Sequence, residues 1–239
     1  MIKVYRLPAL LTALCLFSAV ALAALFLRIQ PTGQMLSAVC ADGDLPVLVL
    51  DPGHGGEDGG AVSVTGTRES VINLDIGLRA ADLAGLIGLP CRLTRESESI
   101  AYPPELKTTA QRKTYDQHAR VDLINGTPNA VLLSIHQNFF PKSSARGPQV
   151  FYAGTPDSDV FADCLREELN AALLPENTRA AKPIAEKIYL MKNVHCTAVL
   201  VECGFLSNAG EARLLDTNEY RLKAASALIS GYLSYLQQR

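Results

Sequence analysis

The sequence predicts a three-layer α/β/α domain on a twisted, mixed and mostly parallel sheet, preceded by an N-terminal transmembrane or signal helix. Two observations predict the domain. From residue 47 onwards, short and nearly continuous apolar runs alternate with longer segments of helical spacing. Strands that are apolar on both faces are typical of a sheet covered by helices on both sides. A long apolar stretch near the amino terminus predicts the preceding helix.

Residues 1–29 have the pattern of a membrane anchor or an export signal. Residues 7–27 are apolar or small apart from two hydroxyl side chains, and they follow Lys3 and Arg6. About 20 apolar residues span a bilayer, and a positive flank is expected on the cytoplasmic side. Ala-Leu-Ala at 21–23 would suit a signal peptidase, but the apolar run is long for a cleaved signal, which favours a retained anchor. With either outcome, we expect the rest of the chain to be exported.

A linker at residues 30–46 is expected to join this segment to a folded domain at residues 47–239. About 200 residues are enough for one domain with a well-buried core. The chain has 22 Lys and Arg against 24 Asp and Glu, and no basic stretch is long enough to indicate nucleic-acid binding. The six cysteines form no Cys-x-x-Cys pair, so a cysteine-based zinc site is not indicated and buried free thiols are expected.

The expected elements follow from hydrophobic spacing and from residues that end helices and strands. Residues 47–50 form a buried strand that Asp-Pro-Gly ends. A helix containing residues 71–81 continues until Gly-Leu-Pro at 88–90, and a strand is expected at 91–94. The remaining expected elements are a helix at 107–125, strands at 130–135 and 149–153, a helix at 157–173, strands at 188–191 and 198–201, and a helix at 219–237.

Polar side chains occur where several of these strands end. His54, His136 and Glu202 each lie just past a predicted apolar strand. In open α/β sheets the ligand crevice lies beyond the carboxyl ends of the strands, so these side chains are expected at one edge of the sheet. Two imidazoles and a carboxylate can bind zinc with a water molecule, and a further carboxylate can move that water's proton. The sequence is therefore compatible with a hydrolytic metal site.

The glycine-rich loop around His54 admits other interpretations. A dinucleotide-binding loop is excluded because Asp58 takes the place of the third glycine, and no Gly-Lys-Ser/Thr of a P-loop is present. The chain also lacks His-Glu-x-x-His, which excludes a thermolysin-type helix. Asp51 and Asp58 are both candidates to accept the second ring proton of His54. Spacing alone leaves a metal site and a structural role for the histidines both open.

Several longer motifs occur in a characteristic order. They are Asp-Pro-Gly-His-Gly-Gly-x-Asp-Gly-Gly-Ala at 51–61, Glu69, Leu-Thr-Arg at 93–95, Ser-Ile-His-x-Asn at 134–138, and Val-Glu-Cys-Gly-Phe-Leu-Ser-Asn at 201–208 followed by Glu211. This series resembles the zinc-dependent N-acetylmuramoyl-L-alanine amidases that have the type 3 catalytic domain. The resemblance covers residue 47 to the carboxyl terminus, and it implies that residues 47–239 are the catalytic domain.

The resemblance also implies a role for each site residue. His54, Glu69 and His136 match the zinc ligands of the family, and Glu202 matches its catalytic glutamate. The implied reaction is hydrolysis of the amide between N-acetylmuramic acid and L-alanine in peptidoglycan. In this reaction Glu202 acts first as general base and then as general acid.

Other residues near these motifs have less specific expectations. Arg95 and Arg120 match family positions and are expected either to brace the fold or to touch substrate. Cys203 is not expected to act as a nucleophile, because the adjacent carboxylate disfavours the thiolate. The segment after Asn138 is too short for the long inhibitory helix that some family members insert, so a self-blocked site is not expected.

The small size, the N-terminal anchor and the lack of separate wall-binding repeats resemble the germination-specific, spore-cortex type, which is linked to muramic-δ-lactam formation. A general cell-wall or cell-separation amidase is an alternative, and so is a zinc peptidase that cuts within the stem peptide. A non-catalytic binding protein would be expected to lack one of the four site residues. Peptidoglycan is the expected substrate, an activating protein partner is left open, and membrane contact is expected through the N-terminal segment.

Overall fold

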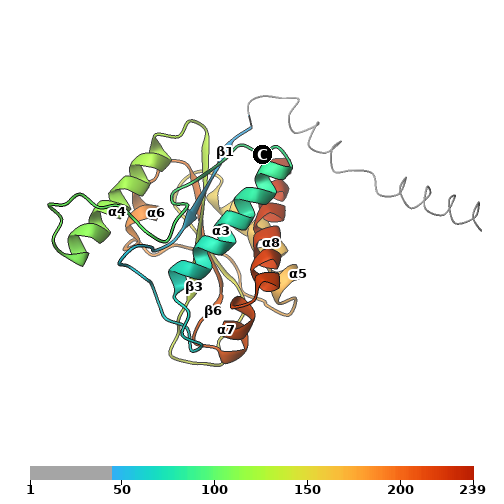
Figure 1. The fold of residues 1–239 in the computed structure, drawn as a ribbon. Helices are drawn as coiled ribbons and strands as arrows, with labels where there is room; N and C mark the ends of the chain where they lie inside the picture. The colour runs from blue at the N-terminus through green and yellow to red at the C-terminus, as the bar shows by residue number, and fades with distance from the viewer. Residues whose placement is uncertain (1–44) are drawn as a thin grey trace, which may run out of the picture. The chain divides into compact units, whose positions relative to one another are not determined.

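The computed structural model describes residues 45–239, so the expected anchor or signal segment and nearly all of the expected linker lie outside the described residues. Six strands form one sheet in the order β2-β1-β3-β6-β4-β5 (Figure 1). Neighbouring strands pair in parallel except for β4 and β6, which are antiparallel. The predicted mixed, mostly parallel sheet is confirmed. The strands are β1 (Val47–Pro52), β2 (Cys91–Leu93), β3 (Ala130–Asn138), β4 (Gln149–Tyr152), β5 (Lys182–Pro183) and β6 (Thr197–Phe205).

Helices cover both faces of the sheet, as predicted. One face is covered by α3 (Glu69–Leu86), α5 (Ser158–Leu173) and α8 (Asn218–Gln238), and the other by α4 (Thr109–Asn125) and α6 (Tyr189–Asn193) (Figure 1). The short helix α7 (Ala209–Leu215) lies between β6 and α8 in the chain. Within residues 45–239, no helix has both the length and the apolar character needed to cross a membrane.

The central strands are buried on both sides because their side chains are apolar in both directions. Leu48 and Leu50 of β1 and Leu132 and Leu133 of β3 have no exposed surface. Burying one such side chain contributes about 1.5–3 kcal/mol, so these two strands anchor the layers together. They also form a firm support for the residues at their carboxyl ends.

Helix α4 begins at a position that the sequence specifies locally. The side chain of Thr108 accepts a hydrogen bond from the Gln111 amide, and the Gln111 side chain accepts one from the Thr108 amide. This capping box satisfies two amides that the first turn of a helix leaves without partners. The capping box fixes the residue at which α4 begins. It therefore also fixes which α4 side chains face the carboxyl edge of the sheet.

One predicted element is wrong. Residues 188–191 were expected to form a strand, but Tyr189–Asn193 form α6. Leu190, Met191 and Val194 are all buried in the core beneath α4, at a spacing that suits one face of a helix. A short apolar run does not by itself distinguish a strand from a buried helical turn. The sequence prediction also missed β5 and α7, both of which are short.

Candidate active site

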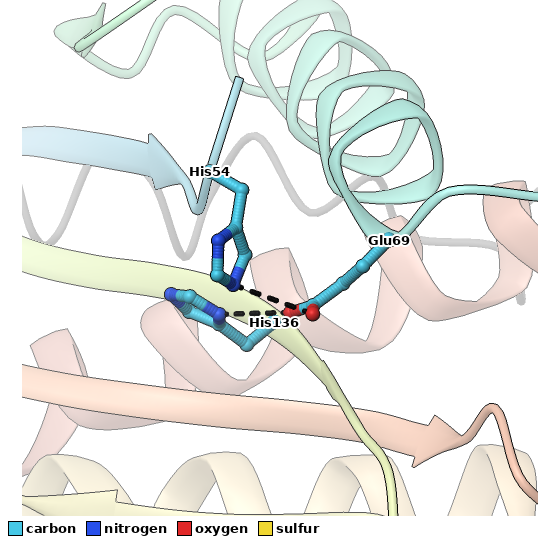
Figure 2. Close-up of side chains that lie close together, drawn as sticks. All are labelled: His54, Glu69 and His136. Carbon is cyan, nitrogen blue, oxygen red and sulfur yellow. Dashed lines mark hydrogen bonds and ion pairs between the residues drawn. The ribbon is translucent and has the colours of Figure 1, made fainter. Parts of the chain in front are cut away.

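Three separate elements bring His54, Glu69 and His136 together. His54 lies in the loop after β1, Glu69 is the first residue of α3, and His136 lies on β3 (Figure 2). His54 Nε2 is 3.3 Å from Glu69 Oε2, and His136 Nδ1 is 2.9 Å from Glu69 Oε1. One donor atom from each residue falls within 4.8 Å of the other two. Residues far apart in the sequence therefore present two nitrogens and one oxygen to one point.

This donor set fits a tetrahedral metal ion. Zinc binds histidine nitrogen and carboxylate oxygen at about 2.0–2.2 Å, which places tetrahedral ligand atoms roughly 3.3 Å apart. The contacts of Glu69 with the two histidines are close to that separation. The cluster of His54, Glu69 and His136 can thus hold a metal ion with small side-chain adjustments and leave a position for water.

Glu69 is buried and held by several donors. Its carboxylate accepts hydrogen bonds from the backbone amides of Ala61, at 3.0 Å, and Gln137, at 3.2 Å. The side-chain amide of Asn73 donates a third hydrogen bond at 3.4 Å. Burial alone would raise the pKa of Glu69, but the contacts with His136 and His54 outweigh it and hold the pKa well below its usual range. Glu69 is therefore an ionised carboxylate in a fixed position.

Two glycines allow this close packing. A Cβ atom at Gly53 would lie 2.2 Å from the ring of His136. A Cβ atom at Gly60 would lie 2.6 Å from Glu69 Oε2, and the positive φ of 66° at Gly60 also disfavours other residues. Glycine is thus required at these two positions, because the side chains of the site occupy the space that a Cβ atom would need.

Two buried arginines hold the loop that carries His54, whose φ of 62° lies in the left-handed region that few non-glycine residues adopt. Arg95 donates hydrogen bonds to the carbonyl oxygens of Pro52, at 2.9 Å, and Gly53, at 3.0 Å. Arg120 donates to the carbonyl oxygens of Pro52, at 2.8 Å, and His54, at 2.6 Å. Of the two expected roles for these arginines, bracing the fold is therefore the one that their contacts show.

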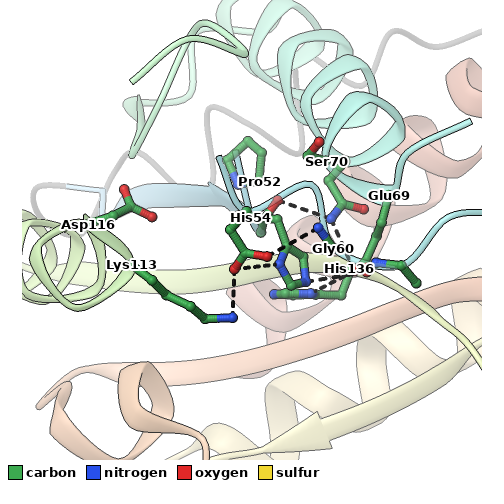
Figure 3. Close-up of polar contacts among 12 residues, drawn as sticks. Pro52, His54, Gly60, Glu69, Ser70, Lys113, Asp116 and His136 are labelled. Atoms are coloured by element: carbon green, nitrogen blue, oxygen red, sulfur yellow. Dashed lines mark hydrogen bonds and ion pairs between the residues drawn. The ribbon is translucent and has the colours of Figure 1, made fainter. Parts of the chain in front are cut away.

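One of the two aspartates that were expected to orient His54 does so. Asp58 Oδ2 lies 3.1 Å from His54 Nδ1, and Lys113 of α4 lies 2.7 Å from the same oxygen. Figure 3 shows the side chain of Lys113 extending toward the side chains around His54. Burial disfavours the charged imidazole, but the hydrogen bonds with Asp58 and Glu69 outweigh it and raise the pKa of His54 to about 9.

Asp51 has different partners, and its expected contact with His54 is wrong. The Asp51 carboxylate accepts hydrogen bonds from Thr94 and Ser134, both at 2.7 Å, and from Arg120 at 2.8 Å. It lies on β1 itself, where the alternation of side chains directs it toward the neighbouring strand residues rather than toward the loop. Asp51 consequently supports His54 only indirectly, through Arg120.

Glu202 faces the same cleft from β6. The register of the sheet pairs Glu202 with His136 of β3. The strands extend to Asn138 and Phe205, so both residues lie inside their strands rather than just past them. Within the described part of the chain, the buried Oε2 atom of Glu202 has no hydrogen-bond partner. Burial raises the pKa of Glu202 to about 7, which suits a group that accepts and returns a proton near neutral pH.

These residues line a cleft of about 360 Å³ at the carboxyl edge of β1, β3 and β6. His54, His136 and Glu202 face it, and α4 together with residues 187–190 forms one wall. The sequence prediction did not include this wall. Lys113 and Lys187 contribute to it, but no strand end or motif marks either lysine, so only the packing of α4 and α6 reveals them.

Two further expectations are met. Cys203 has no exposed surface, and burial raises the pKa of its thiol to about 12, which excludes a role as thiolate nucleophile. Residues 139–148, between β3 and β4, form no helix that would cover the cleft. The four cysteines in residues 45–239 are free, and two of them, Cys164 and Cys203, are buried.

Comparison with solved structures supports the fold. The CwlD amidase from Clostridioides difficile, solved in complex with the GerS lipoprotein, is similar with a TM-score of 0.78 and 38% sequence identity. The match covers 81% of this chain and 100% of that chain. The arrangement of strands and helices is therefore one that a solved amidase also has.

Sequence comparison leads to the same family. The chain is 38% identical over 194 residues to the germination-specific N-acetylmuramoyl-L-alanine amidase of Bacillus subtilis, with 81% of each chain covered. It is 31% identical over 191 residues to the amidase LytC of the same species, but spans only 35% of the length of LytC. Residues 48–233 match the family model described as N-acetylmuramoyl-L-alanine amidase. The chain therefore belongs to the N-acetylmuramoyl-L-alanine amidase family.

Proposed function

We propose that this protein hydrolyses the amide between N-acetylmuramic acid and L-alanine in peptidoglycan, with zinc held by His54, Glu69 and His136 and with Glu202 moving the proton. The observation that carries the proposal is the convergence of the three donor side chains beside a fourth, buried carboxyl that has no hydrogen-bond partner on Oε2. Membership of the amidase family supports the choice of bond.

The division of labour follows from the surroundings of each residue. When bound to the three ligands, zinc supplies a Lewis acid that polarises the amide carbonyl and lowers the pKa of a water molecule. Glu202 takes a proton from the attacking water and gives a proton to the L-alanine amine as the C–N bond breaks. Asp58 keeps the His54 ring oriented during these steps, and Arg95 and Arg120 keep its loop in place.

We further propose that the substrate is spore-cortex peptidoglycan, where the product would lead to muramic-δ-lactam, or the wall during germination. Similarity over 81% of both chains to a germination-specific amidase supports this role. Residues 7–27 would export the domain and anchor it in the membrane or be removed. A solved relative forms a complex with a lipoprotein, which supports an activating protein partner for this chain as well.

The test incubates the purified full-length protein with cortex and vegetative peptidoglycan and labels the amino groups that appear. We expect new L-alanine amino termini, a metal content near one zinc per chain, and loss of release after chelation with recovery on adding zinc. Glu202→Gln serves as the inactive, metal-loaded control.

Each alternative predicts a different product. A zinc peptidase would expose amino termini within the stem peptide, and a general cell-wall amidase would cleave vegetative peptidoglycan at least as fast as cortex. Absence of chelator-sensitive release of L-alanine amino termini from both substrates, with candidate partner proteins added, would overturn the amidase proposal.

A further inference from the structure

The cleft contains acidic and basic side chains, and nearly all of them are paired with one another. Asp51 and Asp116 both contact Arg120, at 2.8 and 2.9 Å. Asp58 contacts His54 and Lys113. The positive charges of Arg120 and Lys113 are therefore already matched by carboxylates of the protein.

Lys187 differs from these groups. It lines the same cleft, and among residues 45–239 its ammonium group has neither an ion-pair nor a hydrogen-bond partner. It is exposed to solvent, so an unpaired charge costs little in the free protein. An unpaired cation in the cleft attracts a negative group on whatever molecule enters it.

The position of Lys187 is set by a well-packed wall. Lys187 lies two residues before the first residue of α6, a helix whose Leu190 and Met191 are buried. The ring of Tyr189 stacks on His118 of α4, with ring centroids 5.1 Å apart and planes 16° from parallel. This packing joins α6 to α4, and Figure 1 shows the two helices together on the same face of the sheet. The backbone at Lys187 is therefore held at a defined place in the wall of the cleft that His54 and His136 also line.

The two sides of the proposed substrate differ in charge. On one side of the scissile amide are N-acetylated sugars, which carry hydroxyl and amide groups. On the other side is a peptide, whose residue after L-alanine carries a carboxylate unless that group is amidated. A cation on the α4 and α6 wall matches the peptide side and not the sugar side.

We propose that Lys187 is a substrate-binding residue that pairs with a stem-peptide carboxylate on the leaving-group side of the scissile bond. The proposal rests on the proposed amidase function and adds an orientation to it, with the peptide along the wall formed by α4 and residues 187–190. The pair would form equally in the bound substrate and in the transition state, because the carboxylate does not take part in the reaction. It is therefore expected to affect KM and not kcat.

The experiment compares two soluble substrates that differ in one group. Both are N-acetylmuramoyl-L-alanyl dipeptides whose D-glutamate γ-carboxyl is blocked as a methylamide, and they differ only at the α-carbon, which carries a carboxylate in one and a neutral amide in the other. Wild-type protein is expected to have a KM about twofold to fivefold lower for the acid than for the amide, the size of an exposed charge pair. Lys187→Met should remove this preference by raising KM for the acid alone, with kcat unchanged.

Two further variants make the result specific. Lys192→Met, an exposed lysine of α6 that does not line the cleft, changes the net charge equally and should keep the wild-type preference. Lys187→Arg keeps the positive charge and should retain most of the preference for the acid substrate. Zinc content and melting temperature should be the same in all variants, since Lys187 has no partner within the fold.

The outcomes separate this inference from the proposed function. Failure of wild-type protein to release L-alanine amino termini from either substrate would count against the amidase proposal itself. Hydrolysis of both substrates with an unchanged preference in Lys187→Met would overturn the role of Lys187 alone. An equal loss of preference in Lys192→Met would also overturn it, because general electrostatic attraction would then explain the effect.

Discussion

Glu69 and Glu202 are two glutamates of one candidate site, and their surroundings are opposite. The Glu69 carboxylate accepts hydrogen bonds from two backbone amides and from Asn73, and it faces both histidines. The Oε2 atom of Glu202 is also buried, but it has no donor among the described residues. The pKa of Glu69 is consequently held well below its usual range, whereas burial raises that of Glu202 to about 7.

The comparison shows that burial alone does not determine the state of a carboxyl group. The supply of donors decides whether the negative charge is kept. A carboxylate that stays ionised and fixed is suited to bind a metal ion, and one whose proton is easily gained or lost near neutral pH is suited to transfer protons. The two roles follow from the local hydrogen bonds rather than from residue type.

The largest expected effect separates these two roles directly. Glu202→Gln keeps the size of the side chain but cannot take up a proton, so we expect the rate of L-alanine release to fall by about 10²–10⁴ while zinc remains bound. Glu69→Gln should instead lose most of the bound zinc together with activity, because a charged ligand is lost. Metal analysis after dialysis and a rate measurement on the same samples check both. Equal zinc loss in the two variants would contradict the assignment.

Asp51 tests whether the rule holds for a carboxylate outside the ligand set. It is as buried as Glu69 and is likewise supplied with donors by Arg120, Thr94 and Ser134. Burial would raise its pKa, but these contacts, with Arg120 the strongest, lower it below the usual 3.8. Asp51→Asn should reduce the free energy of unfolding by about 3 kcal/mol at pH 7, because the buried Arg120 loses part of its compensation.

The same residue gives a pH dependence with a defined sign. Because the pKa of Asp51 is lower in the folded than in the unfolded protein, its ionised form stabilises the fold at pH values above about 4. That contribution is lost as the pH falls below this value toward the folded-state pKa. The gap between the urea midpoints of wild type and Asp51→Asn should therefore narrow from pH 6 to pH 3. A constant gap would show that the charge of Asp51 is not what stabilises the fold.

Much of the fold could be predicted because the strands are apolar runs of distinctive composition. The strands at 47–50 and 130–135 and the helices at 107–125 and 219–237 correspond to β1, β3, α4 and α8. Residues 188–191 were assigned wrongly because α6 has only five residues, too few to reveal a helical period. Short elements are defined by what packs on them, and spacing along the chain does not contain that information.

The site was predictable to a different degree for each residue. His54, His136 and Glu202 each come after an apolar run in the sequence, so the topology of the sheet alone places them at its carboxyl edge. Glu69 begins a helix instead, so strand topology does not place it, and the family resemblance gave it the role of a metal ligand. The choice between Asp51 and Asp58 as partner of His54 depends on side-chain direction, and Lys187 depends on how α6 packs on α4, so neither could be read from the sequence.

The smallest expected effect tests the hydrogen bonds that set Glu69 apart from Glu202. Asn73 donates to Glu69 and to the carbonyl oxygen of Gly53, and it accepts a hydrogen bond from the side chain of Gln137. Asn73→Ala should weaken zinc binding by about tenfold, the lower end of the effect of groups that orient a metal ligand, and leave kcat at saturating zinc nearly unchanged.

The matched control is Asn170→Ala, which removes a buried asparagine of α5 whose partner is Asn177, away from the cleft. Both substitutions remove hydrogen bonds from a buried helix position, so both are expected to lower the melting temperature. A competition titration with a coloured zinc chelator distinguishes them, because only Asn73→Ala should change the zinc affinity. If the two variants bind zinc equally well, the backbone amides of Ala61 and Gln137 fix Glu69 without help from Asn73, and the side-chain amide has no part in its contrast with Glu202.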